Sequence, residues 1–487
     1  MLFNSLDFAV FLPVFFLLYW GVFRGRTKEQ NVLVVVASYV FYGWWDWRFL
    51  GLIAFSTLID FSIGLRLKSE NSTYRRRGWL WLSLIVNLGL LGFFKYYNFF
   101  LDNFVAAFLL FGTPLEAEGL KVVLPVGISF YTFQTLSYTI DVYRRKLEPT
   151  RDLVAFSAFV SFFPQLVAGP IERATHLLPQ FYRRRYFDYQ QALDGTRQIV
   201  WGFFKKVVIA DNCAEIANMI FNSSDDFSGS TLALGASFFA LQIYGDFSGY
   251  SDIAIGTARI FGFDLMQNFA FPYFSRDIAE FWRRWHISLS TWFRDYVYIP
   301  LGGSRGGTWM RVRNTFIVFA VSGFWHGANW TFVIWGLLNA MYFLPLLLTE
   351  ANRSHLEIVA KNRFFPSVID LGKMGVTFGL TVVAWIFFRA ENLSHAYRYI
   401  YEMFSGLTEV QPYRQTARIL LNQVGVPLLL TYLSFFLIEW LGREKQYALQ
   451  AIDHWNGRLQ WTVLVFVTTW MLLTMSTGQN EFIYFQF

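Results

Sequence analysis

Long apolar stretches alternate with short polar ones along almost the whole chain. Hydrophobic runs that approach the length of a membrane span occur near residues 8–23, 31–45, 49–65, 78–94, 122–140, 153–168, 197–221, 231–247, 316–328, 331–348, 374–390, 425–441 and 461–475. A helix that crosses the bilayer needs about 20 residues, so we expect several runs to extend into their flanks or to be half-helices. The pattern predicts an all-α polytopic integral membrane protein.

The segment 268–315 departs from this pattern, because it is aromatic and charged and contains no clean spanning run. Helical spacing predicts one helix here, with one face formed by Trp282, His286, Leu289 and Phe293. A basic aromatic helix of this kind lies on the membrane or dips into it. We therefore predict a re-entrant or interfacial segment on the cytoplasmic side, within a single membrane domain of residues 1–487.

Two earlier stretches place polar or helix-breaking residues in apolar surroundings. Residues 164–173 contain two prolines, and residues 242–252 contain two glycines and two aspartates. Interrupted helices at membrane depth are tolerated only against protein or a water-filled cavity. We expect both stretches to interrupt their helices, and the middle of the chain to surround a polar cavity.

Composition supports the membrane assignment and sets the direction of insertion. The 487 residues are 55% hydrophobic and only 15% charged, where soluble proteins average about 25%. The net charge of +7 does not indicate nucleic-acid binding, because the basic residues lie in short clusters between apolar runs. The first, third and fifth loops are the basic ones, so the positive-inside rule predicts that they are cytoplasmic and that the N-terminus is outside.

The chain offers few groups for metal or thiol chemistry. Cys213 is the one cysteine, which excludes an internal disulfide and a cysteine-based zinc site. Two histidines without an adjacent third ligand do not make a metal site either. We expect no metal and no permanently bound cofactor.

Two of the six histidines have unusual surroundings. His326 lies in an apolar run and His286 in the basic aromatic segment, whereas the other four lie in polar loops or near span ends and are expected to be solvated. A buried histidine can join two helices by hydrogen bonding, or it can exchange a proton near neutral pH. A third alternative, an acyl-enzyme on Ser322 one turn before His326, lacks the surrounding turn of a nucleophile elbow.

A direct transfer fits a lone buried histidine well. His326 would take the proton of an attacking hydroxyl while a thioester or similar donor is cleaved. The basic residues of the 268–315 segment suit a phosphate-bearing donor such as acetyl-CoA or a pantetheine carrier. The positive-inside rule explains the side on which these arginines lie, but not their density among tryptophans.

Four blocks of sequence and the chain ending are distinctive: Gln165-Leu-Val-Ala-Gly-Pro-Ile-Glu-Arg, Asp246-Phe-Ser-Gly-Tyr-Ser-Asp-Ile-Ala-Ile-Gly, Glu280-Phe-Trp-Arg-Arg-Trp-His-Ile-Ser-Leu-Ser, Phe324-Trp-His-Gly-Ala-Asn-Trp and the ending Glu481-Phe-Ile-Tyr-Phe-Gln-Phe. They resemble the membrane-bound O-acyltransferase family, in its bacterial branch of alginate O-acetyltransferases and teichoic-acid D-alanyl transfer proteins. The resemblance covers essentially the whole chain, and the order of the blocks makes it specific.

The resemblance implies a fold, a reaction and a site. It implies a ring of helices around a thin region pierced by a tunnel, with a cytoplasmic acyl donor and an external acceptor. His326 matches the family's catalytic histidine and His286 its second histidine. We expect the substrate-binding residues to be Arg284, Trp285, Arg294, Asp295, Trp325 and Asn329.

The family also implies a setting and partners. We expect a multi-pass protein of the bacterial inner membrane that moves acetyl groups for O-acetylation of an extracellular polysaccharide such as alginate. A periplasmic or membrane-anchored acetyltransferase would complete the modification, and a small carrier protein could supply the acyl group. Two alternatives remain: acyl or D-alanyl transfer to a teichoic-acid-type acceptor, and a transporter without chemistry, for which we find no inverted repeat.

Overall fold

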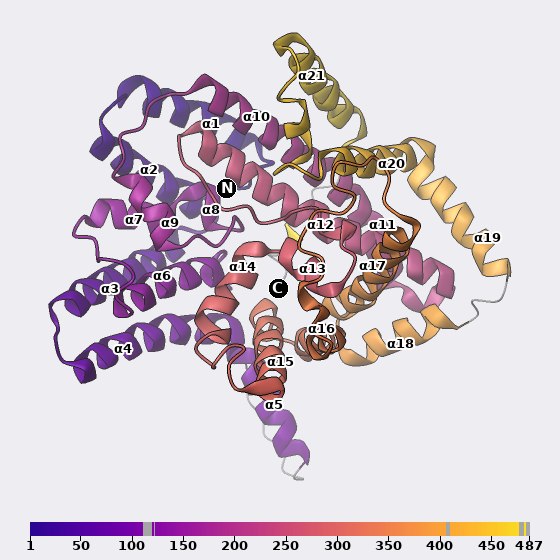
Figure 1. Ribbon diagram of the computed structural model, residues 1–487, viewed down its shortest axis with the longest axis horizontal. Helices are drawn as coiled ribbons and strands as arrows, with labels where there is room; N and C mark the ends of the chain where they lie inside the picture. The colour runs from indigo at the N-terminus through magenta and orange to yellow at the C-terminus, as the bar shows by residue number, and fades with distance from the viewer. Residues whose placement is uncertain (111–118, 121, 406–409, 477–481, 484–487) are drawn as a thin grey trace. The chain divides into compact units, whose positions relative to one another are not determined.

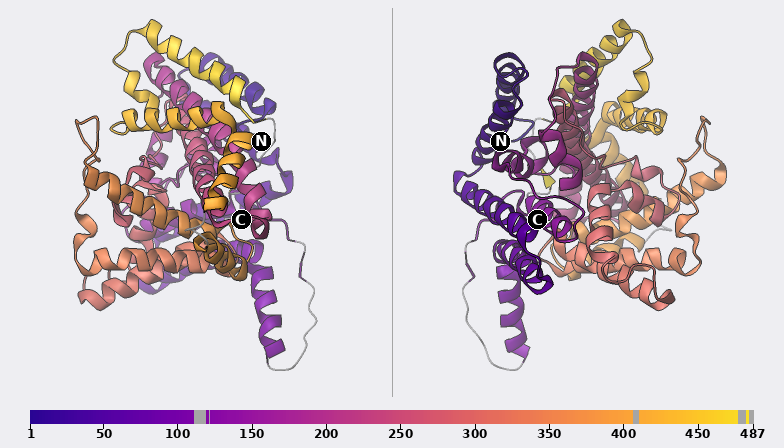
Figure 2. Two further views of the ribbon diagram at one scale, coloured as in Figure 1. Left: turned by 90° about the vertical axis from the view of Figure 1, so that its right-hand side faces the viewer. Right: turned by 60° about the vertical axis from the view of Figure 1, so that its left-hand side comes forward.

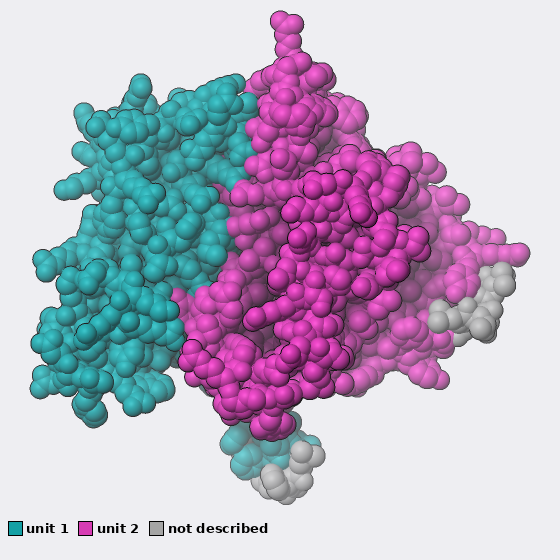
Figure 3. Space-filling view, viewed as in Figure 1, with its two compact units in different colours: residues 1–195, 257–266 teal, residues 196–256, 267–487 magenta. Residues whose placement is uncertain are grey.

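The computed structural model describes residues 1–110, 119–120, 122–405, 410–476 and 482–483, and every regular element among them is a helix (Figure 1). Within this part, five helical stretches are long and apolar enough to cross a membrane: Trp47–Ser69, Thr73–Leu109, Trp330–Leu348, Val368–Arg389 and Pro412–Gly442. The expected all-α polytopic membrane protein is confirmed. The described chain forms two compact units, residues 1–195 with 257–266 and residues 196–256 with 267–487 (Figure 3). The single domain and the ring around a tunnel stay predictions.

The first unit is a set of apolar helices with short connections. Its helices are α1 (Leu6–Leu17), α2 (Thr27–Gly43), α3 (Leu50–Ser69), α4 (Thr73–Leu91), α5 (Tyr97–Leu110), α6 (Ile128–Tyr143), α7 (Leu153–Ser161), α8 (Phe163–Leu166), α9 (Ala174–Leu177) and the start of α10 (Tyr189–Phe203). A π-helical stretch (Gly92–Tyr96) joins α4 to α5, and α5 projects beyond the other helices of the unit (Figure 2).

Polar side chains join three helices of this unit at buried positions. The carboxylate of Asp60 on α3 accepts hydrogen bonds from Ser83 and Asn87 of α4 and from Thr139 of α6, at 2.5, 2.8 and 2.9 Å. In an apolar environment each of these bonds satisfies a group that would otherwise be costly to bury. Asp60 therefore fixes the register of α3, α4 and α6.

The predicted interruption at residues 164–173 is confirmed. Helix α7 ends at Ser161, the short α8 has Pro164 in its first turn, and α9 begins only at Ala174. Proline at the start of a helix loses no hydrogen bond, but it cannot continue the helix that precedes it. The two prolines thus divide what the hydrophobic pattern shows as one run.

The second unit holds the remaining helices. They are the rest of α10, α11 (Asp211–Asn222), α12 (Gly229–Ile260, through residue 256), α13 (Ile278–Arg284), α14 (Ile287–Phe293), α15 (Gly307–His326), α16 (Trp330–Leu348), α17 (Val368–Arg389), α18 (Leu393–Phe404), α19 (Val410–Ile419), α20 (Gly425–Gly442) and α21 (Gly457–Thr474). A π-helical stretch, Phe204–Ala210, joins α10 to α11.

The predicted interruption at residues 242–252 is wrong, because α12 runs unbroken through it. Its glycines serve close packing instead. A Cβ on Gly245 would lie 2.9 Å from the carbonyl oxygen of Lys205, and one on Gly249 would lie 2.7 Å from that of Gly202. Small residues allow two helix backbones to approach in this way.

The two aspartates of this stretch pair with consecutive lysines of the π-helical stretch. Lys205 lies 2.5 Å from Asp252, and Lys206 lies 2.9 Å from Asp246, all four side chains being buried. The extra residue per turn in a π-helix changes the direction of successive side chains. The polar residues of α12 are thus neutralised against a neighbouring helix.

The single helix expected across residues 278–293 is also wrong. The chain forms two short helices, α13 and α14, and His286 lies between them with φ of 44°. A left-handed backbone is uncommon for any residue with a side chain. It is held here because the backbone N–H groups of Ala270 and Ile287 donate to the carbonyl oxygens of Arg284 and Asn268, both at 2.9 Å.

Candidate functional site

His326 is the last residue of α15, where that helix meets α16. The two helices pack closely through glycines: a Cβ on Gly323 would meet the carbonyl oxygen of Phe332, and one on Gly336 would meet that of Phe319. Asn329 starts α16, since its side-chain oxygen accepts the backbone N–H of Thr331 at 3.0 Å. This tight turn fixes the position of the His326 ring.

Aromatic rings surround His326. The centroids of the rings of Trp325, Trp335 and Phe388 lie 4.9, 5.1 and 5.4 Å from the centroid of the imidazole, and the residue is only 5% exposed. Such surroundings exclude bulk water, which strengthens electrostatic interactions with a reacting group.

His286 lies close to His326. The centroids of the two imidazoles are 6.5 Å apart, and the Phe247 ring of α12 lies 4.6 Å from His286. Nδ1 of His286 lies 3.0 Å from the side-chain oxygen of Asn268. The structure thus brings together the two histidines that the sequence singled out, and their roles stay predictions.

His286 is fully buried, which decides its protonation state. Burial lowers its pKa to about 3, so the imidazole is neutral at ordinary pH. A neutral imidazole has one N–H donor and one acceptor nitrogen. The tautomer of His286 decides which of its two ring nitrogens is the donor.

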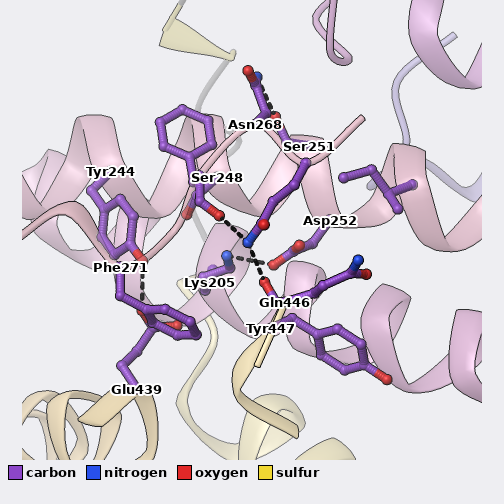
Figure 4. Close-up of a pocket in the computed structure, with 13 residues that line it drawn as sticks. Lys205, Tyr244, Ser248, Ser251, Asp252, Asn268, Phe271, Glu439, Gln446 and Tyr447 are labelled. Atoms are coloured by element: carbon purple, nitrogen blue, oxygen red, sulfur yellow. Dashed lines mark hydrogen bonds and ion pairs between the residues drawn. The ribbon is translucent and has the colours of Figure 1, made fainter. Parts of the chain in front are cut away.

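A small polar pocket lies beside the Asn268 segment (Figure 4). Lys205 and Asp252 form an ion pair there, Tyr244 donates a hydrogen bond to Glu439, and Asn268 donates to the hydroxyl of Ser251 at 3.0 Å. Its volume of about 10 Å³ leaves room for little more than one water molecule. The polar groups predicted to line a cavity in the middle of the chain are therefore mostly paired with one another.

A much larger cavity, of about 830 Å³, opens between α13, α14, α15 and α16. Four arginines line it: Arg283, Arg294, Arg311 and Arg353. Aromatic side chains line it as well: Trp282, Phe293, Phe319 and Phe343. The wall also includes Ser322, one helical turn before His326.

Two tryptophan rings lie in a row from the wall of this cavity to His326. The ring of Trp282, in the cavity wall, lies 5.7 Å from that of Trp335, which in turn lies 5.1 Å from the ring of His326. Nε1 of Trp282 is buried and makes no hydrogen bond with any described residue. The Trp335 ring thus contacts both Trp282, in the cavity wall, and His326.

Three of the expected substrate-binding residues, Arg284, Trp285 and Asn329, make contacts within the protein that account for their positions. Arg284 donates to Glu280 at 2.8 Å and to the carbonyl oxygen of Ala270, and Trp285 packs against Trp385 with 5.0 Å between ring centroids. Asn329 caps α16 and donates to the carbonyl oxygen of Glu391. None of the three lines the large cavity, and their substrate role stays a prediction.

The other three expected residues are Arg294, Asp295 and Trp325. The exposed Arg294 lines the large cavity and pairs with the half-buried Asp295 at 2.8 Å. The Trp325 ring lies 4.9 Å from that of His326 and 6.3 Å from that of His286. No group of three or more His, Cys, Asp or Glu side chains able to hold a metal occurs in the described part of the chain.

The sequence did not indicate Asn268, Trp282 as a cavity residue, or Trp335. Asn268 stands at the start of the basic aromatic segment and carries no motif, so only the fold shows its contact with His286. Trp335 lies nine residues beyond His326 in an ordinary apolar run. The three-dimensional distances of Trp282 and Trp335 from His326 could not be predicted from the sequence.

Comparison with known proteins gives a consistent result. The model of the MBOAT, membrane-bound O-acyltransferase, family matches residues 50–364. A probable alginate O-acetylase of Azotobacter vinelandii is 45% identical over 83% of this chain and 78% of that protein, and one of Pseudomonas putida is 40% identical over the full length of both. A peptidoglycan O-acetyltransferase of Helicobacter pylori is 37% identical over 81% of this chain and 78% of that protein.

Proposed function

Because the chain belongs to the membrane-bound O-acyltransferase family, and is therefore a multi-pass membrane acyltransferase, we propose that it transfers acetyl groups for the O-acetylation of an extracellular polysaccharide such as alginate. The similarity to probable alginate O-acetylases over most of the chain supports this substrate class. We place the protein in the bacterial inner membrane, with a periplasmic or membrane-anchored acetyltransferase as partner. Family membership sets aside the transporter without chemistry.

His326 acts as the general base. Its Nε2 or Nδ1 takes the proton of the acceptor hydroxyl while that oxygen attacks the donor's thioester carbonyl, the C–S bond breaks and the thiolate leaves with its electron pair. The proton on His326 then passes to the thiolate, so the products are an ester and a free thiol. The observation that carries this step is the ring of His326, held in an aromatic enclosure beside a second imidazole.

The 830 Å³ cavity receives the acyl donor. Its arginines suit phosphate groups, and its aromatic side chains suit an apolar arm that reaches toward Ser322 and the turn that follows. The density of basic residues supports a cytoplasmic position for this mouth under the positive-inside rule. The donor is acetyl-CoA or an acyl group on a small carrier protein, both of which carry a phosphopantetheine thioester.

Acyl transfer by the purified protein tests the proposal. The protein in lipid nanodiscs is incubated with acetyl-CoA labelled in the acetyl group, and with oligosaccharide or partner-protein acceptors. We expect label in an ester on the acceptor, and none with His326→Ala. Transfer of D-alanine from a carrier, without acetyl transfer, would favour the teichoic-acid alternative instead.

A further inference from the structure

We propose that Asn268 is a positioning residue that fixes the ring of His286 and its tautomer, so that Nε2 is the nitrogen presented to the reaction. The inference deepens the proposed function, since it assigns the chemical form in which the second histidine takes part. It rests on a chain of four buried side chains: Ser251, Asn268, His286 and Ser288.

The orientation of the Asn268 amide follows from its neighbours. Its side-chain oxygen faces the backbone N–H of Ser288 at 3.4 Å and the hydroxyl of Ser288 at 2.8 Å. A backbone N–H can only donate, so the amide atom that faces it is the oxygen. The amide nitrogen then donates to the Ser251 hydroxyl on α12, at 3.0 Å.

The fixed amide decides the protonation of His286. The amide oxygen can only accept, so Nδ1 of His286, 3.0 Å away, carries the hydrogen. Nε2 is left with its lone pair, is buried, and has no hydrogen-bond partner among the described residues. An unsatisfied buried acceptor is costly to maintain, and such groups are often found where a ligand supplies the missing donor.

Asn268 also holds the backbone at this point. Its carbonyl oxygen accepts the N–H of Ile287, directly after the left-handed His286. One residue thus fixes both the chain direction and the ring of His286. A residue whose only role was packing would not need to contact both.

Among the described residues, the groups that face His286 are apolar or neutral, apart from the titratable ring of His326. Helix α12 presents Phe247, the segment before α13 presents Phe269 and Asn268, and α15 presents Trp325 and His326. The aspartates of α12 that flank Phe247, Asp246 and Asp252, are paired with Lys206 and Lys205. His326 is therefore the titratable neighbour whose charge has to be considered.

The test reads the tautomer directly. With ¹⁵N-histidine labelling, the six imidazoles give six pairs of ring-nitrogen signals, and the loss of one pair in His286→Gln assigns it. In the wild type we expect the shifts of an Nδ1–H tautomer. In Asn268→Ala we expect a mixture or the Nε2–H form, with kcat reduced about 10- to 100-fold and the donor KM little changed. An Nε2–H wild type, or an unchanged tautomer in Asn268→Ala, would overturn the proposal.

A second variant keeps the test valid if Asn268→Ala does not fold. Asn268→Asp has the same shape, and its carboxylate favours the imidazolium, so the pKa of His286 should rise by about 1 to 3 units in the NMR titration. Asn212→Asp is the matched control: its amide donates to the carbonyl oxygens of Val208, one turn earlier in the chain, and of Thr474 on α21, and the substitution should leave the His286 signal unchanged. An unchanged His286 pKa in Asn268→Asp contradicts the proposal. Because these signals need no turnover, a failure of the proposed acetyl transfer is seen separately.

Discussion

The imidazoles of His286 and His326 lie 6.5 Å apart, centroid to centroid, although one comes from a break between two short helices and the other from the end of α15. This separation is beyond direct hydrogen-bond reach. The two rings can therefore contact different atoms of one bound molecule. That arrangement agrees with a base at the attacking hydroxyl and a neutral hydrogen-bond acceptor that faces a donor group elsewhere on the bound molecule.

Replacing His326 by alanine should lower acyl transfer by about 10²- to 10⁴-fold, the usual effect of losing a general base. The measurement is the initial rate of label transfer to acceptor by the purified variant. His454→Ala is the matched control, because this histidine is exposed and its ring contacts only its neighbour Trp455 among the aromatic pairs. A rate near wild type with normal folding would exclude His326 as the base.

Replacing Arg294 or Arg311 by glutamine should raise the KM for a phosphate-bearing donor and leave kcat close to wild type. Both guanidinium groups line the cavity and are partly solvated, so each is expected to contribute about 1 kcal/mol to donor binding. This corresponds to a few-fold change in the donor KM. The donor concentration dependence gives both constants. Arg398→Gln, which breaks an exposed pair with Asp225 outside the cavity, is the control. An effect on the acceptor KM alone would contradict the donor assignment.

Replacing Gly249 by alanine should destabilise the second unit by about 1 to 3 kcal/mol, because the new methyl group meets the backbone of Gly202 at 2.7 Å. The thermal midpoint in detergent measures it. Gly372→Ala provides the comparison, since nothing lies within 4 Å of a Cβ there and alanine favours the helix of α17. Equal midpoints for the two variants would show that α12 does not pack as closely as described.

The contribution of His176 to stability should depend on pH. Hydrogen bonds to Asp264 and Glu172 raise the pKa of this half-buried histidine to about 10, from about 6.5 in an unfolded chain. Because the folded pKa is the higher one, the stabilisation is fully present below about pH 6.5 and is lost as the pH rises toward 10. His176 is thus less solvated than the sequence suggested.

Thermal midpoints of the wild type and His176→Gln between pH 6 and 10 check this dependence. The difference between them should be largest at pH 6 and shrink as the pH rises. His454→Gln is the control and should show a constant difference. A gap that widens with pH would mean that His176 is neutral in the folded protein.

The predicted insertion can be tested by thiol labelling in intact cells. With Cys213 replaced by alanine, single cysteines at Ser5 or Asn98 should react with an impermeant reagent. Those at Asn71 or Arg145 should react only after lysis, because the first, third and fifth loops carry the basic residues. Labelling of Asn71 from outside would invert the orientation and place the arginine-lined cavity on the wrong side for a cytoplasmic donor.

Helix content and the two histidines could be predicted from the sequence, and so could the break at residues 164–173, but the continuity of α12 and the break at His286 could not. Gly245 and Gly249 are compatible with either a hinge or a close helix contact, and only the carbonyl groups of the facing helix decide between them. The break at His286 depends on backbone bonds from Asn268 and Ala270, which no local pattern specifies.

The prediction of the site is limited in the same way, because contacts between distant parts of the chain have no local sequence pattern. The density of arginines in residues 276–313 singled out this segment, and three of these arginines line the cavity. Arg284 instead turns inward and pairs with Glu280. The contact is possible because Arg284 lies one helical turn after Glu280 on α13. Asn268 and Trp335 reach the histidines only through the tertiary fold.

The paired lysines of the π-helical stretch have a consequence for how the protein is made. Lys206 also pairs with Asp211, five residues later in the same helical stretch, at 2.8 Å, whereas Lys205 pairs with Asp252, which is synthesised later. An unpaired ammonium group is costly in hydrocarbon. We therefore expect Lys205 to be neutralised only after α12 has been synthesised and has packed against the stretch that carries this lysine.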